Sequence, residues 1–384
     1  MVCPGVKKAV RSRDRISYFQ FASTFQQLLK PVMKMKLENS DKDAAERALR
    51  SCLNTIPFLR VRRIERNSSG DGARADFVVR LELARGAEQN LLIEYKSSGE
   101  PRLARGAVNQ LVRSSNGDDT YGIFMAPYIS PKAAEICTAS NIGYIDLVGN
   151  CRLAFDNIYI ERQGQANPSR TKRKLRSLYS KKTTRVLRVL LSNPNKPWRL
   201  KALAVESRVS LGQVSNVKEL LLDREWAASS REGLRLTDPE TLLQEWAENY
   251  EFSKNTPQSF YSLMSVSELE TALAKVCDED NIEFALTSFS AAVRYAPAVR
   301  YRRAYAFVDS PERLALSLDI KTVDSGANLI LLTPYDDGVF YDSRDYEDIR
   351  VVSPVQAYLD VRASRERGEE AAEALLDQTL RPSW

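Results

Sequence analysis

Three residues on one expected pair of strands are of the types that bind metal ions and phosphate groups. Asp76 lies in the first segment, residues 73–83, whereas Glu94 and Lys96 lie in the second, residues 91–96. Because side chains alternate between the faces of a strand, Glu94 and Lys96 share one face, and Asp76 can sit opposite them. Carboxylates are the oxygen ligands that Mg²⁺ and Mn²⁺ prefer. A metal ion held by Asp76 and Glu94 would activate a water molecule for attack on a phosphate, with Lys96 orienting that water.

This stretch resembles the PD-(D/E)xK nuclease superfamily over roughly residues 58–162. The matching motifs are Ala75-Asp76, with alanine where the family often has proline, and then Glu94-Tyr95-Lys96. A helix is predicted over residues 102–113, and it carries a glutamine where many members have one that supports the site. A solvated hairpin with an ion pair is the alternative. The resemblance implies four catalytic residues, which are Asp76, Glu94, Lys96 and Gln110.

The absence of histidine excludes several kinds of catalysis. The chain has no histidine among its 384 residues, so it has no Ser-His-Asp or Cys-His site and no His-Glu-x-x-His zinc site. There is also no P-loop and no glycine-rich dinucleotide fingerprint. The chemistry that remains is that of carboxylates, lysine and metal ions with oxygen ligands.

Length and composition predict a soluble protein of two or three domains. The chain of 384 residues is too long for one ordinary core, and its 43% hydrophobic and 28% charged residues are typical of globular proteins. No apolar run is long enough to cross a membrane, and the basic N-terminal segment lacks the apolar core of a signal peptide. Five cysteines far apart in the sequence favour reduced thiols in the cytoplasm: Cys3, Cys52, Cys137, Cys151 and Cys277.

Helices and strands alternate through the first 162 residues. Helices are predicted over residues 16–36 and from Ser40 to about Leu53, followed by a strand at 58–65. Beyond the hairpin and the helix at 102–113, the pattern predicts a strand at 120–126, a helix at 131–140, a strand at 143–147 and two short strands within 151–161. This order indicates an α/β domain with a mixed sheet, and it matches the restriction-endonuclease-like core. Asp146 is either a further site residue or, as its sequence context favours, a turn-former.

A basic block follows this domain. Residues 162–188 contain ten lysines or arginines and no acidic residue. Such a block is usually a solvated linker, but beside a DNA-binding module it can also contact phosphates. Three of its members are candidate phosphate contacts: Lys172, Arg173 and Lys174.

Residues 181–240 have the pattern of a winged helix-turn-helix. Apolar spacing predicts helices at about 186–191, 200–206 and 211–222, followed by a two-stranded wing before residue 237. The third helix of this fold enters the major groove of DNA. Its apolar positions, beginning with Leu211, are expected to face inward, so that the polar ones point out. A protein-binding module is the alternative use. The candidate DNA-binding residues are Gln213, Ser215, Asn216, Lys218, Arg231 and Arg235.

The last third of the chain is predicted to be α+β. Strands are expected at 283–286, 301–308, 314–320, 329–333 and 339–341, with helices at 267–277, after Ser290, at 355–362 and at 369–380. With the winged helix it resembles the AbiEi family, the antitoxin regulators of type IV toxin–antitoxin systems, over about residues 181–380. Segments 284–292, 352–360 and 367–373 carry the resemblance. It implies autoregulatory DNA binding and a C-terminal domain similar to a nucleotidyltransferase core. Thr287-Ser288 is not followed by the Asp-x-Asp pair of active transferases, so no nucleotide transfer is expected.

The predicted fold class is therefore multidomain α/β and α+β. Its parts are a nuclease-like domain (1–162), a basic linker (163–180), a winged helix-turn-helix (181–240) and a nucleotidyltransferase-like domain (241–384). Two functions fit this organisation. One is a Mg²⁺- or Mn²⁺-dependent deoxyribonuclease guided by the winged helix. The other is a non-catalytic transcriptional regulator or antitoxin whose nuclease-like domain is a scaffold.

Both functions take double-stranded DNA as the partner. A cognate toxin and a second copy of the chain are further candidate partners, and no membrane partner is expected. RNA is less favoured, because the sequence has no usual aromatic platform for stacking bases.

Overall fold

The computed structural model describes residues 42–54, 56, 59–66, 75–83, 87–114, 119–156, 158–165, 178–364 and 367–384. The chain divides into two compact units, residues 1–167 and 168–384. Both units contain helices and sheets, so the predicted mixed α/β class is confirmed. The expected helix at 16–36 and the candidate residues Lys172, Arg173 and Lys174 lie outside the described residues.

The first unit is built on a seven-stranded mixed sheet whose strands lie in chain order, β1 to β7. Strands β3, β4 and β5 are parallel, and the pairs on either side of them are antiparallel. The strands are β1 (Arg60–Arg66), β2 (Phe77–Glu82), β3 (Glu88–Tyr95), β4 (Thr120–Ala126), β5 (Gly143–Asp146), β6 (Cys151–Phe155) and β7 (Ile158–Arg162).

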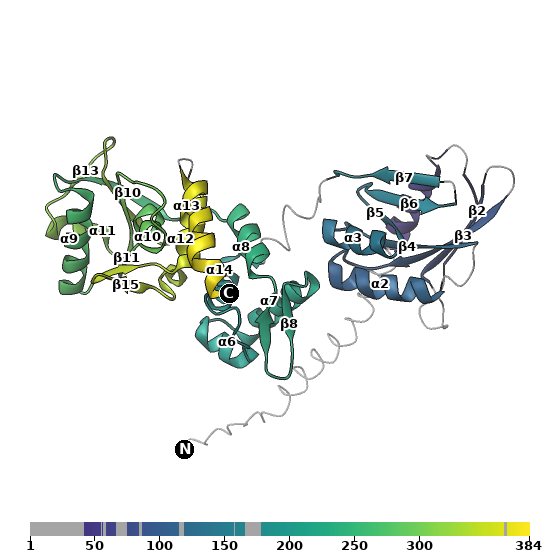
Figure 1. The fold of residues 1–384 in the computed structure, drawn as a ribbon, viewed down its shortest axis with the longest axis horizontal. Helices are drawn as coiled ribbons and strands as arrows, with labels where there is room; N and C mark the ends of the chain where they lie inside the picture. Colours follow the sequence, from purple (N-terminus) through teal and green to yellow (C-terminus); the bar gives the residue numbers. More distant parts are fainter. Residues whose placement is uncertain are drawn as a thin grey trace, which may run out of the picture. The chain divides into compact units, whose positions relative to one another are not determined.

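Helices cover both faces of this sheet (Figure 1). The crossover helices α2 (Pro101–Ser114) and α3 (Pro131–Ala139) pack on one face, where Leu92 is part of the core. The helix over residues 42–54 packs on the other face, where the next residue of β3, Ile93, is buried. Because both faces are covered, β3 and β4 are buried on both sides and form nearly continuous apolar runs.

The second unit begins with three helices and a hairpin. These are α5 (Lys181–Ser192), α6 (Leu200–Glu206), α7 (Leu211–Asp223), β8 (Ala227–Ser229) and β9 (Leu234–Leu236). Ser210 caps α7 by accepting a hydrogen bond from the backbone N–H of Gln213. Trp198 pairs with Leu234 through two backbone hydrogen bonds of 2.8 and 2.9 Å, which adds a third extended segment to the hairpin.

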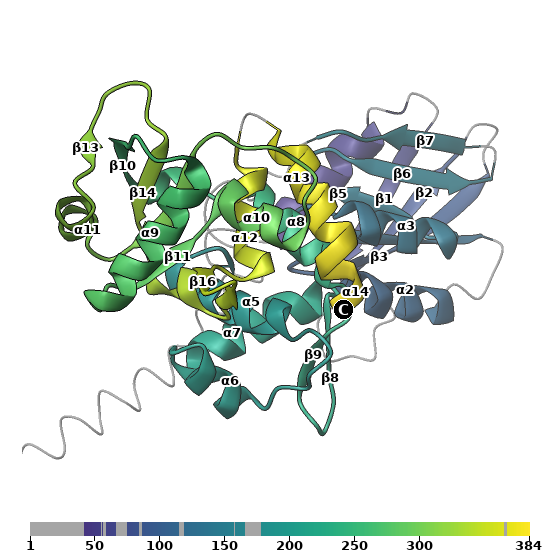
Figure 2. The same ribbon diagram turned by 60° about the vertical axis from the view of Figure 1, so that its left-hand side comes forward.

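A second seven-stranded sheet, in the order β13-β10-β14-β12-β11-β16-β15, fills the rest of this unit (Figure 2). Helix α12 packs against α10 and α13 and also against α5 and α8, so the two parts of the unit share one core. The helices of this part are α8 (Pro239–Glu248), α9 (Val266–Glu279), α10 (Ser288–Tyr295), α11 (Pro311–Ser317), α12 (Pro354–Arg362), α13 (Gly368–Leu375) and α14 (Arg381–Ser383), with short turns η2 (Phe252–Lys254), η3 (Asp337–Phe340) and η4 (Leu376–Leu380). The strands are β10 (Thr256–Tyr261), β11 (Phe284–Leu286), β12 (Ala304–Val308), β13 (Lys321–Thr322), β14 (Leu329–Thr333), β15 (Arg344–Tyr346) and β16 (Ile349–Val351).

Two of the predicted strands in this part are wrong. Residues 314–320 overlap the helix α11, which starts at Pro311, a residue suited to the first turn of a helix. Residues 339–341 overlap the 3-10 turn η3. Strands β10, β15 and β16 were not predicted, because β15 and β16 have three residues each and β10 contains a proline and mostly polar side chains.

Candidate functional site

The hairpin of the first unit brings its acidic residues together. Phe77 of β2 lies opposite Ile93 of β3, and the preceding residue, Asp76, donates its N–H to Ile93 O at 2.9 Å. This register places Asp76 beside Glu94. Lys96 Nζ lies 2.5 Å from Glu94 Oε1, and Gln110 Nε2 of α2 donates to Glu94 Oε2 at 2.8 Å. The structure thus groups all four residues of the predicted catalytic set.

Lys42 completes this cluster and is the residue that the sequence did not reveal. It lies at the start of the 42–54 helix, and its Nζ is 2.7 Å from Asp76 Oδ1. The other oxygen, Asp76 Oδ2, accepts the N–H of Tyr95 at 3.0 Å. No local sequence pattern marks Lys42 as a partner of Asp76, because a lysine at this position is equally compatible with a solvated side chain.

Burial controls the charge of Glu94. The residue is 4% exposed, and this burial raises the pKa of its carboxyl, with the negative charge of Asp76 acting in the same direction. Lys96 opposes the shift through its hydrogen bond and its positive charge. The cluster contains two carboxylates and two ammonium groups, so its charges compensate within a few ångströms.

The residues present only partly fit a divalent metal ion. Two carboxylates are the usual protein contribution to a Mg²⁺ site. Here, however, all four carboxylate oxygens already have partners, and Lys42 and Lys96 supply the positive charge that a metal ion would otherwise bring. Across the described parts of the chain, no group of three or more Cys, Asp or Glu side chains is arranged to hold a metal. Lys42 would therefore compete with a metal ion for Asp76.

Asp146 acts as a turn-former. One of its carboxylate oxygens accepts the backbone N–H groups of Val148, Gly149 and Asn150, at 3.1, 2.9 and 2.8 Å. The other accepts the side-chain amide of Asn150 at 2.8 Å. These bonds close the turn between β5 and β6, which is the structural role that the sequence favoured.

Helix α7 exposes part of the predicted polar surface. Asn216 is exposed, and Ser215 and Lys218 are partly exposed. Gln213 differs from the prediction, because its side-chain amide donates to Thr183 Oγ1 of α5 at 2.7 Å. Leu211, predicted to face inward, is 44% exposed and lies at the start of the helix.

The hairpin β8–β9 carries two exposed arginines, Arg231 at its tip and Arg235 on β9. Between them, Gly233 has a φ of +149° and lies against the backbone of Trp198. A Cβ at this position would come within 2.5 Å of the Trp198 carbonyl group, so glycine is required for the hairpin to pack here.

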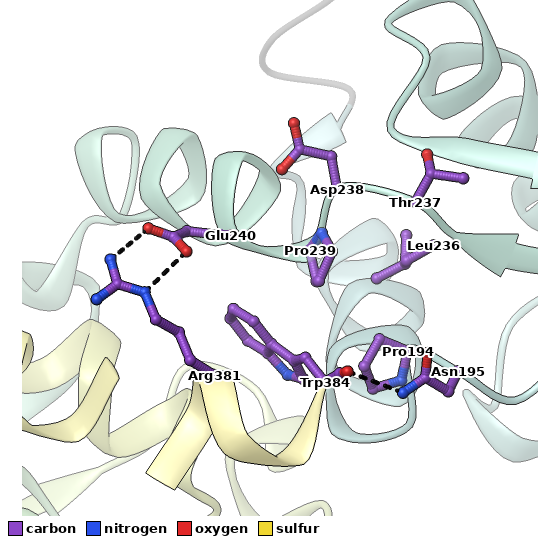
Figure 3. A pocket seen from close by; sticks show the side chains of 9 residues that line it. All are labelled: Pro194, Asn195, Leu236, Thr237, Asp238, Pro239, Glu240, Arg381 and Trp384. Atoms are coloured by element: carbon purple, nitrogen blue, oxygen red, sulfur yellow. Dashed lines mark hydrogen bonds and ion pairs between the residues drawn. The ribbon is translucent and has the colours of Figure 1, made fainter. Parts of the chain in front are cut away.

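An open pocket of about 320 Å³ lies between the end of β9 and the last residues of the chain (Figure 3). Arg381 forms a two-pronged ion pair with Glu240 at 2.9 and 2.6 Å, so its charge is already matched. The Trp384 carbonyl accepts the side-chain amide of Asn195 at 3.1 Å. The pocket therefore marks the joint between the helix–hairpin part and the C-terminal helices. Its lining comprises Pro194, Asn195, Leu236, Thr237, Asp238, Pro239, Glu240, Arg381 and Trp384.

A buried polar network joins the same two parts more deeply. Arg188 of α5 donates two hydrogen bonds to Gln356 Oε1 of α12, at 3.1 and 2.5 Å, and its guanidinium stacks on Trp246. Gln356 Nε2 in turn donates to Asp360 Oδ1 at 2.9 Å. Thr287, at the start of α10, also donates to Asp360. Thr287 and Ser288 are thus buried beside α12.

Comparison with known families assigns the C-terminal part of the second unit. Residues 235–381 match the AbiEi antitoxin family. The family is described as a transcriptional regulator, the AbiEi antitoxin of a type IV toxin–antitoxin system, and the match covers fewer than half of the 384 residues. It runs from β9 through α14, so the helices α5 to α7 and the whole first unit lie outside it. No curated protein and no solved structure was found to match the chain.

The match supports the regulator or antitoxin reading better than the nuclease reading, for which neither the family match nor any other comparison gives support. Among the described residues, no helix combines the length and the apolar character that crossing a membrane requires.

Proposed function

We propose that the protein is a DNA-binding transcriptional regulator of the AbiEi antitoxin type. The observation that carries the proposal is the family match over residues 235–381, in a unit whose remaining part is three helices and a hairpin on the same core. The order of three helices and a hairpin supports the proposal, because a winged helix-turn-helix has the same order and its third helix reads the major groove.

Helix α7 is the proposed recognition helix. Asn216 is exposed on it, and an asparagine amide can make two hydrogen bonds to an adenine edge, whereas Ser215 accepts several bases. Lys218 on the same helix is suited to a phosphate contact. Gln213 would contact a base only after releasing Thr183.

A gel-shift titration with the DNA upstream of the protein's own gene tests this function. We expect a retarded band at low salt, where phosphate contacts are strongest. Asn216→Ala should weaken binding to the upstream DNA more than it weakens binding to unrelated DNA of equal length. Lys275→Ala, an exposed lysine on α9, is the control and should bind as the wild type does. Absence of any retarded band at low salt would remove the proposal.

The same proposal includes two partners. The family description names a toxin–antitoxin system, which supports a cognate toxin, and a second copy of the chain is the other proposed partner. Co-expression with the product of the neighbouring gene tests the first partner, because an antitoxin restores growth. Sedimentation with and without operator DNA tests the second.

A second candidate function is phosphodiester hydrolysis in the first unit. The grouping of Asp76, Glu94, Lys96 and Gln110 in one cluster favours it, and the ion pair of Lys42 with Asp76 opposes it.

Plasmid DNA incubated with the protein and Mg²⁺ or Mn²⁺ decides this second function. If the cluster is catalytic, Lys96→Ala should lose nicking activity while Lys132→Ala, an exposed lysine on α3, keeps it. Equal and negligible nicking by all three proteins would reject hydrolysis and leave the regulator proposal untouched.

A further inference from the structure

Helix α7 exposes a large apolar side chain in its first turn. Leu211 is 44% exposed, whereas Val214, Val217 and Leu221 on the same helix are buried. These three buried residues attach α7 to the core of the second unit, and Leu211 lies outside that core. Because single exposed leucines are common on protein surfaces, the neighbours of Leu211 must indicate whether it has a partner.

The residue after Leu211 is a glycine that the fold does not require. Gly212 is exposed and lies within the helix, and its φ is not in the positive range that favours glycine. A Cβ added at this position would have no neighbouring atom within 4 Å. Alanine would form the helix better, because glycine is among the poorest helix formers. Glycine does, however, allow a helix backbone to approach a ligand closely, so its presence here favours such a contact.

Leu211 and Gly212 adjoin polar residues on the surface of α7. Residues four positions apart are neighbours on a helix surface, which places Leu211 beside Ser215 and Gly212 beside Asn216. Ser215 is partly exposed and Asn216 is exposed. This face therefore presents an apolar group, a hydroxyl, an amide and accessible backbone within two turns. Glu219 is exposed farther along the helix, and its carboxylate would be repelled by phosphates, which limits a contact with DNA to these first turns.

The major groove of DNA presents a matching set of groups. Its floor carries hydrogen-bond donors and acceptors on every base pair, and thymine adds the apolar C5 methyl group. In helix-turn-helix complexes, the first residues of the recognition helix contact the base edges. An apolar side chain at this point distinguishes thymine from the other bases by its methyl group.

We propose that Leu211 is a specificity-determining residue that packs on the C5 methyl group of a thymine, and that Gly212 allows the close approach. The inference rests on the proposed DNA-binding function and specifies what α7 selects. Asn216 on the same surface is suited to adenine, so the first two turns of α7 select A·T base pairs.

Replacement of thymine by uracil tests the methyl contact, because uracil still pairs with adenine and lacks only the methyl group. Duplexes of the DNA upstream of the gene carry uracil at one thymine at a time, and each is titrated with the full-length protein by fluorescence anisotropy. We expect uracil to weaken binding by about fourfold at the contacted thymine, which corresponds to the loss of one buried methyl group.

Three variants assign the effect to residues. Leu211→Ala should bind the unmodified duplex more weakly and no longer distinguish thymine from uracil at the contacted position. Val205→Ala is the control, at a position 78% exposed on the neighbouring helix α6, and it should keep the fourfold difference. Gly212→Ala should weaken binding to every duplex on the order of tenfold, while its urea unfolding midpoint stays unchanged or rises.

Two results overturn the inference and leave the proposed function standing. One is a protein that binds the upstream DNA equally well whichever thymine is replaced. The other is a uracil effect that Leu211→Ala retains, which would assign the methyl contact to another side chain. Unchanged DNA binding by Gly212→Ala would contradict the close approach of the helix backbone. Absence of binding to any duplex at low salt would instead reject the proposed function, and this inference with it.

Discussion

Asp360 is a buried carboxyl group held by three donors. Thr287, Tyr250 and Gln356 each donate a hydrogen bond to it, and the residue is 2% exposed. Burial raises its pKa from 3.8 to about 6, although the hydrogen bonds and the charge of Arg188 oppose this shift. The folded protein therefore takes up a proton here at a higher pH than the unfolded chain does.

This shift predicts a pH dependence of stability. The contribution of Asp360 is fully present below about pH 4 and is lost as the pH rises through about 6. The amide of Asp360→Asn does not ionise. Between pH 4 and pH 7 we therefore expect the free energy of unfolding to fall less in this variant than in the wild type, and the difference should be on the order of 2 to 3 kcal/mol. Urea unfolding at both pH values checks it. Asp345→Asn, at an exposed site, should follow the wild type.

Tryptophan fluorescence is a selective probe for this measurement. All four tryptophans of the chain, Trp198, Trp226, Trp246 and Trp384, lie in the second unit. The signal therefore reports the unit that contains Asp360.

Lys42 competes with any cation for Asp76. Its ammonium group lies 2.7 Å from the carboxylate, so Lys42→Ala removes the charge that compensates Asp76. We expect this variant to bind Mn²⁺ more tightly than the wild type, by calorimetry, if the cluster can act as a metal site. Arg50→Ala, on the same helix but paired with Glu46, should show no gain. Equal Mn²⁺ binding by all three proteins would show that the cluster is structural.

If the protein binds DNA as proposed, the exposed arginines of the hairpin β8–β9 are expected to contact phosphates rather than bases. We expect Arg231→Ala and Arg235→Ala to weaken binding of all DNA sequences alike, and each to reduce the salt slope of log K by about 1. Titrations at several salt concentrations measure this slope. A loss confined to one DNA sequence would instead assign the arginine to base readout.

Gly233 determines whether the hairpin can close on Trp198. A side chain there meets the Trp198 backbone and adopts an unfavourable φ, so we expect Gly233→Ala to destabilise the second unit by about 1 to 3 kcal/mol. Chemical unfolding measures the loss. Ala228→Gly, at an exposed position of the same hairpin, is the matched control and should cost less.

Elements with a clear apolar period were predictable from the sequence. The helix that carries Ala45, Leu49 and Leu53 has all three fully buried, and the element order of the first unit is as expected. Helix α11 was mistaken for a strand because Leu314, Leu316 and Leu318 alternate. In the structure Leu314 is buried and Leu316 is 83% exposed, so this alternation does not mark one buried face.

Contacts between distant segments were not predictable. The pairing of Asp76 with Glu94 follows from hairpin register, which the sequence indicates. The contacts of Lys42 with Asp76 and of Gln213 with Thr183 depend instead on how a helix packs against a separate element. Local pattern contains no information about such packing, because each residue is compatible with a solvated position.

At the scale of the whole molecule, residues 168–384 form one compact unit with a shared core. Arg188 is buried in α5, and its principal partners, Gln356 and Trp246, lie in α12 and α8. Arg185 of α5 likewise forms a two-pronged ion pair with Asp336, at 2.9 and 2.8 Å. The helix–hairpin part therefore depends on the part that matches the antitoxin family.

This dependence predicts that Arg188→Ala unfolds both parts together. Removing the guanidinium leaves Gln356 Oε1 without its donor in the core, so we expect a loss of about 2 to 4 kcal/mol and a single transition at lower urea concentration. Fluorescence and circular dichroism should give coincident curves. Arg302→Ala, an exposed arginine, is the control. Two separate transitions would show that the parts fold independently.

The Arg188–Gln356–Asp360 network also limits which segments of this chain can be exchanged with those of another protein. A helix α5 grafted onto a foreign C-terminal half would carry a buried cation into a core without the matching amide and acid, at a cost of several kcal/mol. If the protein binds DNA as proposed, changes in its target sequence are therefore expected to arise by substitutions on the exposed side of α7 rather than by exchange of the whole helix–hairpin part.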